Sequence, residues 1–176
     1  QNVQQMQLVW SWAMDDAGAN EMTPLVHDGI MYLPNPGGVI QALDGATGDL
    51  IWEYRPSKEG AKPPPAPQTV SGELSEIPRQ SQRPIAAAPE GGGEGRAIQR
   101  NVAIFGDKIF GATEDAHIIA LNAKDGKLVW DTKMADHALG FSYTAGPIVV
   151  RGKAIAGITG CGRYKNDVCF IAGLDA

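Results

Sequence analysis

The sequence predicts an all-β fold built from repeated four-stranded units. An internal repeat is the main observation: segment 42–52 reads ALDGATGDLIW, segment 120–130 reads ALNAKDGKLVW, and segment 173–176 begins the pattern again with GLDA. Short runs of β-forming residues come in groups of four with turn residues between them, and no stretch has a convincing helical period. Four strands per unit with a tryptophan in the last strand is typical of a β-propeller blade. We therefore predict a β-propeller fragment of about three blades.

The repeated motif has the chemistry of a β-hairpin. An apolar run ends in Asp or Asn, whose side chain can bond the backbone that follows and initiate a turn. Gly48 and Gly126 complete the two turns, because glycine adopts a positive φ at no steric cost. Apolar residues then lead to Trp52 and Trp130, which stand at the same place in the repeat. We expect both tryptophans to be buried between adjacent blades.

The repeat divides the chain into three blades. Blade one is expected at about 20–54, blade two at about 100–132, and an incomplete blade three, without its last strand, at about 143–176. A further short strand is expected at 8–13. The strands expected within the blades are 23–26, 30–33, 39–43 and 50–54, then 102–105, 109–112, 118–121 and 128–131, then 147–150, 154–158 and 170–174. A propeller avoids open sheet edges by closing its ring, so the remainder of the propeller is an expected partner.

An insertion at 55–99 separates blades one and two. It is rich in proline and glycine, with PPP at 63–65 and GGG at 91–93. Such a composition is typical of a polar, mobile loop. A long loop within a compact fold is more often functional than decorative, for instance as a lid or a docking surface.

Composition argues against some classes of function. The formal net charge of -5 disfavours non-specific binding of nucleic acid, and no apolar run approaches the length of a membrane span. Gln1 in place of Met is typical of a mature or trimmed chain, so the lack of a visible signal peptide carries no weight. The two cysteines, Cys161 and Cys169, cannot form a structural zinc site unaided. A local disulfide is the better interpretation, and it implies an oxidising compartment.

The repeat resembles the tryptophan-docking motif of the quinoprotein alcohol dehydrogenases, which use pyrroloquinoline quinone (PQQ). The resemblance covers nearly the whole chain except 55–99. It implies the N-terminal segment of an eight-bladed propeller that holds PQQ in its axial channel and oxidises an alcohol by hydride transfer to the quinone. By analogy it also implies a periplasmic location and a soluble cytochrome c as the electron acceptor.

Two charged residues match cofactor-binding positions of that family. Glu21 lies three places before a proline, where the family has a Glu that contacts the quinone. Arg100 lies directly before the first strand of blade two, where the family places an Arg. A planar guanidinium suits quinone or carboxylate oxygens. Without a cofactor, Glu21 would be a solvated residue before a strand, and Arg100 a surface residue at the end of a loop.

Two turns of blade three supply the other matches. Thr144 precedes Ala-Gly-Pro, and Thr159 follows an isoleucine and precedes Gly160 and Cys161. The resemblance implies that both hydroxyl groups donate hydrogen bonds to the carboxylates of PQQ, joined by the backbone amides of Gly160 and Cys161. The competing interpretation is that each threonine is simply a β-forming residue at the end of a strand.

Two departures from the family pattern affect the site. Many members carry adjacent cysteines shortly before the Arg, but segment 92–95 reads GGEG. Many members also have a Glu calcium ligand where this chain has Gly162, and the loss of a carboxylate weakens the case for calcium or another metal. Asn166 or Asp167 could supply oxygen ligands instead, but an ordinary turn is the simpler interpretation. No metal ligand is therefore assigned.

No catalytic residue is assigned either. The family's catalytic base is an Asp from a later blade, and no segment of this sequence matches it, so Asp15, Asp16 and Asp115 are not given that role. The rival hypothesis is a non-enzymatic propeller scaffold that binds peptides or partner proteins. A scaffold has no need to gather the four matched side chains around one axis, so their placement separates the two hypotheses.

Overall fold

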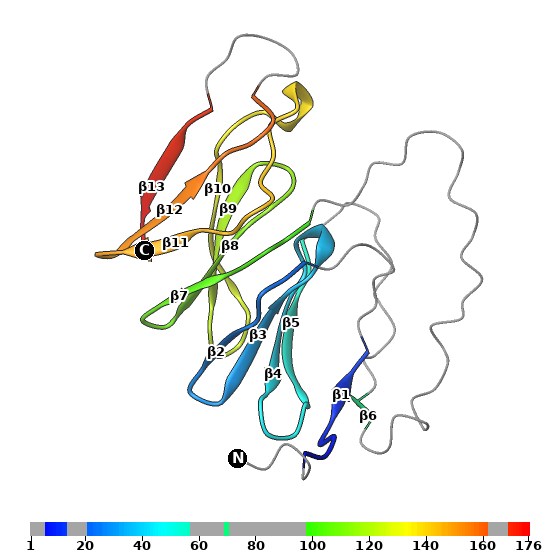
Figure 1. Ribbon diagram of the computed structural model, residues 1–176. Coiled ribbons are helices and arrows are strands. Elements are labelled where there is room, and N and C mark those ends of the chain that lie inside the picture. Colours follow the sequence, from blue (N-terminus) through cyan, green and yellow to red (C-terminus); the bar gives the residue numbers. More distant parts are fainter. Residues whose placement is uncertain (1–5, 14–20, 57–68, 71–97, 162–168) are drawn as a thin grey trace, which may run out of the picture.

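The computed structural model of the chain describes residues 6–13, 21–56, 69–70, 98–161 and 169–176. Most of the predicted insertion lies outside these ranges, as do Asp15, Asp16, Gly162, Asn166 and Asp167. The described part is almost entirely β, with three antiparallel sheets that fan out side by side (Figure 1). This arrangement confirms the predicted fold class.

Each of the three sheets is a meander in which strands pair in sequence order. Blade one comprises β2 (Leu25–His27), β3 (Ile30–Pro34), β4 (Ile40–Asp44) and β5 (Leu50–Tyr54). Blade two comprises β7 (Ala103–Phe105), β8 (Lys108–Ala112), β9 (His117–Asn122) and β10 (Leu128–Lys133). Blade three comprises β11 (Ile148–Val150), β12 (Lys153–Gly157) and β13 (Ile171–Asp175). The remaining elements are a small sheet of β1 (Ser11–Trp12) with β6 (Thr69–Val70) and two 3-10 turns, η2 (Pro36–Gly38) and η5 (His137–Leu139).

The turns between the third and fourth strands have the expected chemistry. In blade one, the Asp44 carboxylate accepts hydrogen bonds from the backbone N–H groups of Thr47 at 2.9 Å and Ala46 at 2.8 Å. These two bonds hold the pKa of Asp44 below its usual range, because they favour the ionised carboxylate. In blade two, the side-chain oxygen of Asn122 accepts an equivalent backbone hydrogen bond. Gly126 completes that turn with a φ of 69°.

Blade one is attached to blade two through Trp52, the tryptophan of its repeat. The indole Nε1 donates a hydrogen bond to the backbone oxygen of Ala123 at 2.9 Å. The indole ring lies against Gly126, where a Cβ atom would be 2.5 Å from the ring. Glycine is the residue that leaves room for this contact and also adopts the required positive φ. Trp52 is 7% exposed, so its predicted burial is confirmed.

Trp10 makes the same contact with blade one. Its Nε1 donates a hydrogen bond to the backbone oxygen of Gly45 at 3.2 Å, and a Cβ atom on Gly48 would be 2.6 Å from its ring. Trp10 therefore has the role of a repeat tryptophan that precedes blade one. The signal in the sequence is the tripeptide Leu-Val-Trp at 8–10, which also ends the second repeat.

Trp130 differs from Trp52. It is half-buried, and its ring centroid lies 5.9 Å from that of Phe110 in its own blade. It also packs against hydrophobic clusters that include Ala154 and Ile158 of blade three. Trp130 thus lies between two blades as predicted, but its predicted burial is only partial.

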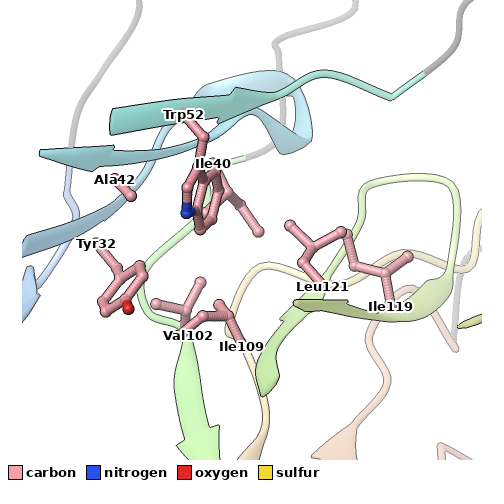
Figure 2. Close-up of a cluster of buried hydrophobic side chains, with 8 residues drawn as sticks. All are labelled: Tyr32, Ile40, Ala42, Trp52, Val102, Ile109, Ile119 and Leu121. Atoms are coloured by element: carbon pink, nitrogen blue, oxygen red, sulfur yellow. The ribbon is translucent and has the colours of Figure 1, made fainter. Parts of the chain in front are cut away.

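A hydrophobic cluster between blades one and two completes their attachment. Figure 2 shows the side chains from β3, β4 and β5 facing those of blade two. Full burial of an aliphatic or aromatic side chain contributes about 1.5–3 kcal/mol, so the cluster is a major source of stability between these blades. Its buried members are Tyr32, Ile40, Ala42 and Trp52 of blade one and Val102, Ile109, Ile119 and Leu121 of blade two.

A disulfide joins Cys161 and Cys169, as predicted from the sequence. Their Cα atoms are 5.2 Å apart. The bond links the segment that follows β12 to the segment that precedes β13.

Replacement of Trp52 by Ala should lower the free energy of unfolding of the full-length protein by about 3–5 kcal/mol, because a buried aromatic group is lost. Chemical denaturation followed by circular dichroism measures this change. The matched control is Ile51→Ala, at an adjacent residue that is 44% exposed, and it should be nearly neutral. Equally small changes in both variants would contradict the attachment role of Trp52.

Loss of the disulfide should lower the free energy of unfolding by about 2–3 kcal/mol, because the bond limits the unfolded chain to conformations with a closed loop. The measurement compares the full-length protein with its Cys161→Ser/Cys169→Ser variant in chemical denaturation. Alkylation without reductant, read by mass spectrometry, provides the direct check. Modification of both cysteines under native or denaturing conditions would show that the bond is absent.

Candidate cofactor-binding site

The predicted site residues lie where the chain enters the first strand of each blade or leaves the second. Glu21 precedes β2, Arg100 precedes β7 and Thr144 precedes β11. The turn 159–161 follows β12, which pairs antiparallel with β11, so it lies at the same end of blade three as Thr144. The first strands β7 and β11 are neighbours across the two blades (Figure 1).

Arg100 connects all three blades. Its Nη2 donates a hydrogen bond to the Glu21 carboxylate at 3.0 Å, and its Nη1 donates to the backbone oxygen of Thr144 at 3.3 Å. The backbone oxygen of Arg100 accepts a hydrogen bond from the N–H of Thr23 at 2.7 Å. The structure therefore brings three of the predicted site residues into direct contact.

The ion pair between Arg100 and Glu21 is solvent-exposed. The side chains are 44% and 52% exposed, respectively. An exposed ion pair of this kind contributes about 0–1 kcal/mol to stability, so the fold gains little from it. A guanidinium has more N–H groups than its bonds to Glu21 and Thr144 use. The exposed Arg100 can therefore donate further hydrogen bonds to an anionic or carbonyl-rich ligand.

Thr159 is tied to Ser142, a residue that sequence reasoning missed. The two residues form an isolated antiparallel bridge. The Thr159 hydroxyl donates to the backbone oxygen of Ser142 at 2.9 Å and lies 3.2 Å from the Ser142 hydroxyl. The hydroxyl proton of Thr159 is thus already engaged in a hydrogen bond, so this hydroxyl must rotate before it can donate to a ligand. The available signal was the alternation of Ser142, Tyr143 and Thr144, which is typical of a strand with one polar face.

Gly160 occupies a position that admits no side chain. Its φ is 90°, and a Cβ atom would lie 1.9 Å from the backbone oxygen of Gly140, the residue that ends η5. The backbone of this turn is therefore held closely against the segment that leads to Ser142. The next residue, Cys161, is half-buried and is anchored by its disulfide.

Tyr143 anchors the Thr144 segment in the core. Its side chain is fully buried and packs with apolar residues of blades two and three, including Ile118 and Ile158. Burial raises its pKa above the usual value. Its hydroxyl has no hydrogen-bond partner among the described residues.

The described ranges lack both a cluster of metal ligands and a membrane-spanning helix. These ranges contain no group of three or more His, Cys, Asp or Glu side chains placed to hold a metal ion. Gly162, Asn166 and Asp167, which were considered in connection with a metal, lie outside them. None of the helical segments in the described part is long and apolar enough to cross a membrane.

Antiparallel blades docked by tryptophan on glycine, with polar residues gathered at the entries to the first strands, define a segment of a β-propeller protein. The sequence pattern of the PQQ glucose/ethanol/alcohol dehydrogenase β-propeller domain matches residues 1–131. This match covers most of the chain, and the chain belongs to that family.

Curated relatives agree with this assignment. The quinoprotein alcohol dehydrogenase PedH of Pseudomonas putida is 32% identical over 161 residues, which are 90% of this chain and 22% of PedH. A 1-butanol dehydrogenase (cytochrome c) of Thauera butanivorans is 28% identical over 157 residues, which are 89% of this chain and 19% of that protein. The chain thus spans about a fifth of the length of these relatives.

Solved structures show the same fold. A europium-containing methanol dehydrogenase matches with a TM-score of 0.70 and 27% identity, over 99% of this chain and 26% of that one. BamB from Moraxella catarrhalis matches with a TM-score of 0.51 and 14% identity, over 93% of this chain and 43% of that one. At that identity, the likeness to BamB is one of fold alone.

Replacement of Tyr143 by Phe should leave the free energy of unfolding unchanged or raise it slightly, because the buried hydroxyl forms no hydrogen bond with the described residues. Chemical denaturation of the full-length protein provides the measurement. Tyr143→Ala is the comparison, and it should cost about 3–5 kcal/mol because it empties a filled core position. A loss of more than about 1 kcal/mol in Tyr143→Phe would mean that the hydroxyl has a partner.

Proposed function

We propose that this chain is the N-terminal segment of a quinoprotein alcohol dehydrogenase and binds one side of PQQ. The full-length enzyme would oxidise an alcohol. When bound, PQQ supplies the chemistry by accepting the hydride that leaves the alcohol carbon. The role of this chain is to hold and orient the cofactor.

The hydrogen bonds of Arg100 to Glu21 and to the backbone oxygen of Thr144 are the observation that supports this proposal. A carbonyl-rich quinone with carboxylate groups needs positive charge and hydrogen-bond donors, and an exposed guanidinium supplies both. Glu21 and the Thr144 backbone fix the direction of Arg100 through the bonds described above. The chain thus holds a cation in place at a position where its ion pair adds little stability.

The remaining site residues would complete this side of the pocket for PQQ. Glu21 would accept a hydrogen bond from a protonated group of PQQ, and the hydroxyl of Thr144 would donate to a carboxylate. The backbone amides of Gly160 and Cys161 would donate in the same way, with Thr159 taking part once its hydroxyl turns away from Ser142. The donor set fits an anionic ligand, because it contains one cation and several neutral donors against a single carboxylate.

Other components of the proposed enzyme would lie elsewhere in the full-length protein. We assign the catalytic base and any ligands for calcium or another metal to other blades, and the remainder of the propeller to the same enzyme. A periplasmic location accords with the disulfide. A soluble cytochrome c is the proposed electron acceptor, in line with the name of the Thauera butanivorans relative.

Replacement of Arg100 by Ala in the full-length protein should weaken PQQ binding at least tenfold, since a charge-assisted hydrogen bond is worth about 1.5–3 kcal/mol and about 1.4 kcal/mol is one decade of affinity. Glu21→Gln should have a milder effect, because the amide keeps an acceptor. Titration of the apo protein with PQQ, followed by fluorescence and by alcohol dehydrogenase activity, measures both.

The matched control is Arg55→Ala, which removes another arginine that pairs with a glutamate, Glu53. This variant should bind PQQ like the parent. If Arg100→Ala and Glu21→Gln also bind PQQ and regain activity like the parent, the proposed site is wrong and the scaffold hypothesis moves ahead.

A further inference from the structure

We propose that Asn101 is a positioning residue for PQQ binding, which it serves by fixing the Thr144 segment of blade three relative to Arg100. This inference rests on the proposed function. Asn101 follows Arg100 directly and precedes β7, so the two residues share one stretch of backbone. Neither its type nor its spacing singled it out in the sequence.

Both polar atoms of the Asn101 side chain are bonded to blade three. Its Oδ1 accepts a hydrogen bond from the N–H of Gly146 at 3.0 Å, and its Nδ2 donates to the backbone oxygen of Pro147 at 3.3 Å. The side-chain amide thus bonds one donor and one acceptor of two consecutive residues. This pairing fixes both the distance and the direction of the segment that enters β11.

The two backbones approach each other closely at this point. A Cβ atom on Gly146 would lie 1.8 Å from the backbone oxygen of Asn101. Pro147 is among the most deeply buried residues of the chain. The segment from Thr144 to Pro147 is therefore held at one end by Arg100 and at the other by Asn101 and the core.

The two bonds of Asn101 affect the site because they restrain the position of Thr144 relative to Arg100. Arg100 reaches only the backbone oxygen of Thr144, through a bond of 3.3 Å that is exposed to water. Such a bond is weak and does not by itself fix the Thr144 hydroxyl relative to the guanidinium. The half-buried amide of Asn101 provides the stronger restraint, with two bonds instead of one. Removal of this amide should leave the fold intact but loosen the spacing between the two PQQ-binding groups.

The test is a binding titration of the full-length apo protein with PQQ, read by fluorescence instead of activity. Asn101→Ala should weaken binding about tenfold, the effect expected for the loss of two neutral hydrogen bonds. The control is Asn122→Ala, which removes a side-chain amide that bonds the backbone N–H of Lys124, at the end of blade two opposite to Arg100. It should bind PQQ like the parent even if it lowers stability as much.

A double variant separates positioning from a general loss of stability. If Asn101 acts by aligning the Thr144 segment with Arg100, then Asn101→Ala should have little further effect on PQQ affinity once Arg100 is already Ala. Full additivity of the two effects would overturn the proposal. Should Asn101→Ala fail to fold, Asn101→Ser keeps a polar side chain that is too short for both bonds, and the same tenfold loss is expected.

The outcomes separate the role of Asn101 from the proposed function of the chain. Tight binding of PQQ by the parent together with parent-like binding by Asn101→Ala would overturn only the role of Asn101. No binding by the parent would overturn the proposed function and this inference with it. Weakened binding in Asn101→Ala, parent-like binding in Asn122→Ala and non-additivity with Arg100→Ala would together support the positioning role.

Discussion

The contact between an indole ring and a glycine of the next blade sets the geometry on which the rest of this structure depends. Trp52 lies so close to Gly126 that no side chain fits between them, and its Nε1 bonds the same turn. Trp10 repeats the arrangement on Gly48. Between blades one and two, the contact therefore limits how closely the blades approach and at what angle they meet. A hydrophobic cluster can form between the blades because this spacing has been fixed.

The positions of the polar residues in the candidate site depend on the spacing of the blades. Each blade contributes to it through the residues that enter its first strand, and none of the three entries is a site alone. Arg100 bridges them, with Glu21 on one side and Thr144 on the other. A change in the angle between blades would move Glu21, Arg100 and Thr144 relative to one another and lengthen the hydrogen bonds between them. The outer contacts that attach the blades and the inner contacts that could hold a ligand thus depend on each other.

Sequence reasoning reached the features that repeat and missed those that depend on contact between distant segments. The turns and Trp52 were predictable because a hairpin motif carries local chemistry that recurs with a fixed pattern. The resemblance to a known family singled out Arg100 as a candidate, and the structure shows that it contacts Glu21 and Thr144. Ser142 and Asn101 were not found, because their partners lie in other strands and an isolated Ser or Asn is common in loops. The partial burial of Trp130 was not predicted, because burial depends on what the next blade places over the ring.

If the proposed site binds PQQ, the bridging position of Arg100 would couple ligand binding to the stability of the propeller. A molecule that binds Arg100 and the Thr144 segment adds its binding energy to the forces that hold three blades in register, so occupancy raises the cost of separating them by mass action. Without a ligand, the inner ends of the blades are held by an exposed ion pair, by backbone bonds and by the side-chain amide of Asn101. Hydrogen exchange of backbone N–H groups near the first strands should accordingly slow when the proposed site is filled.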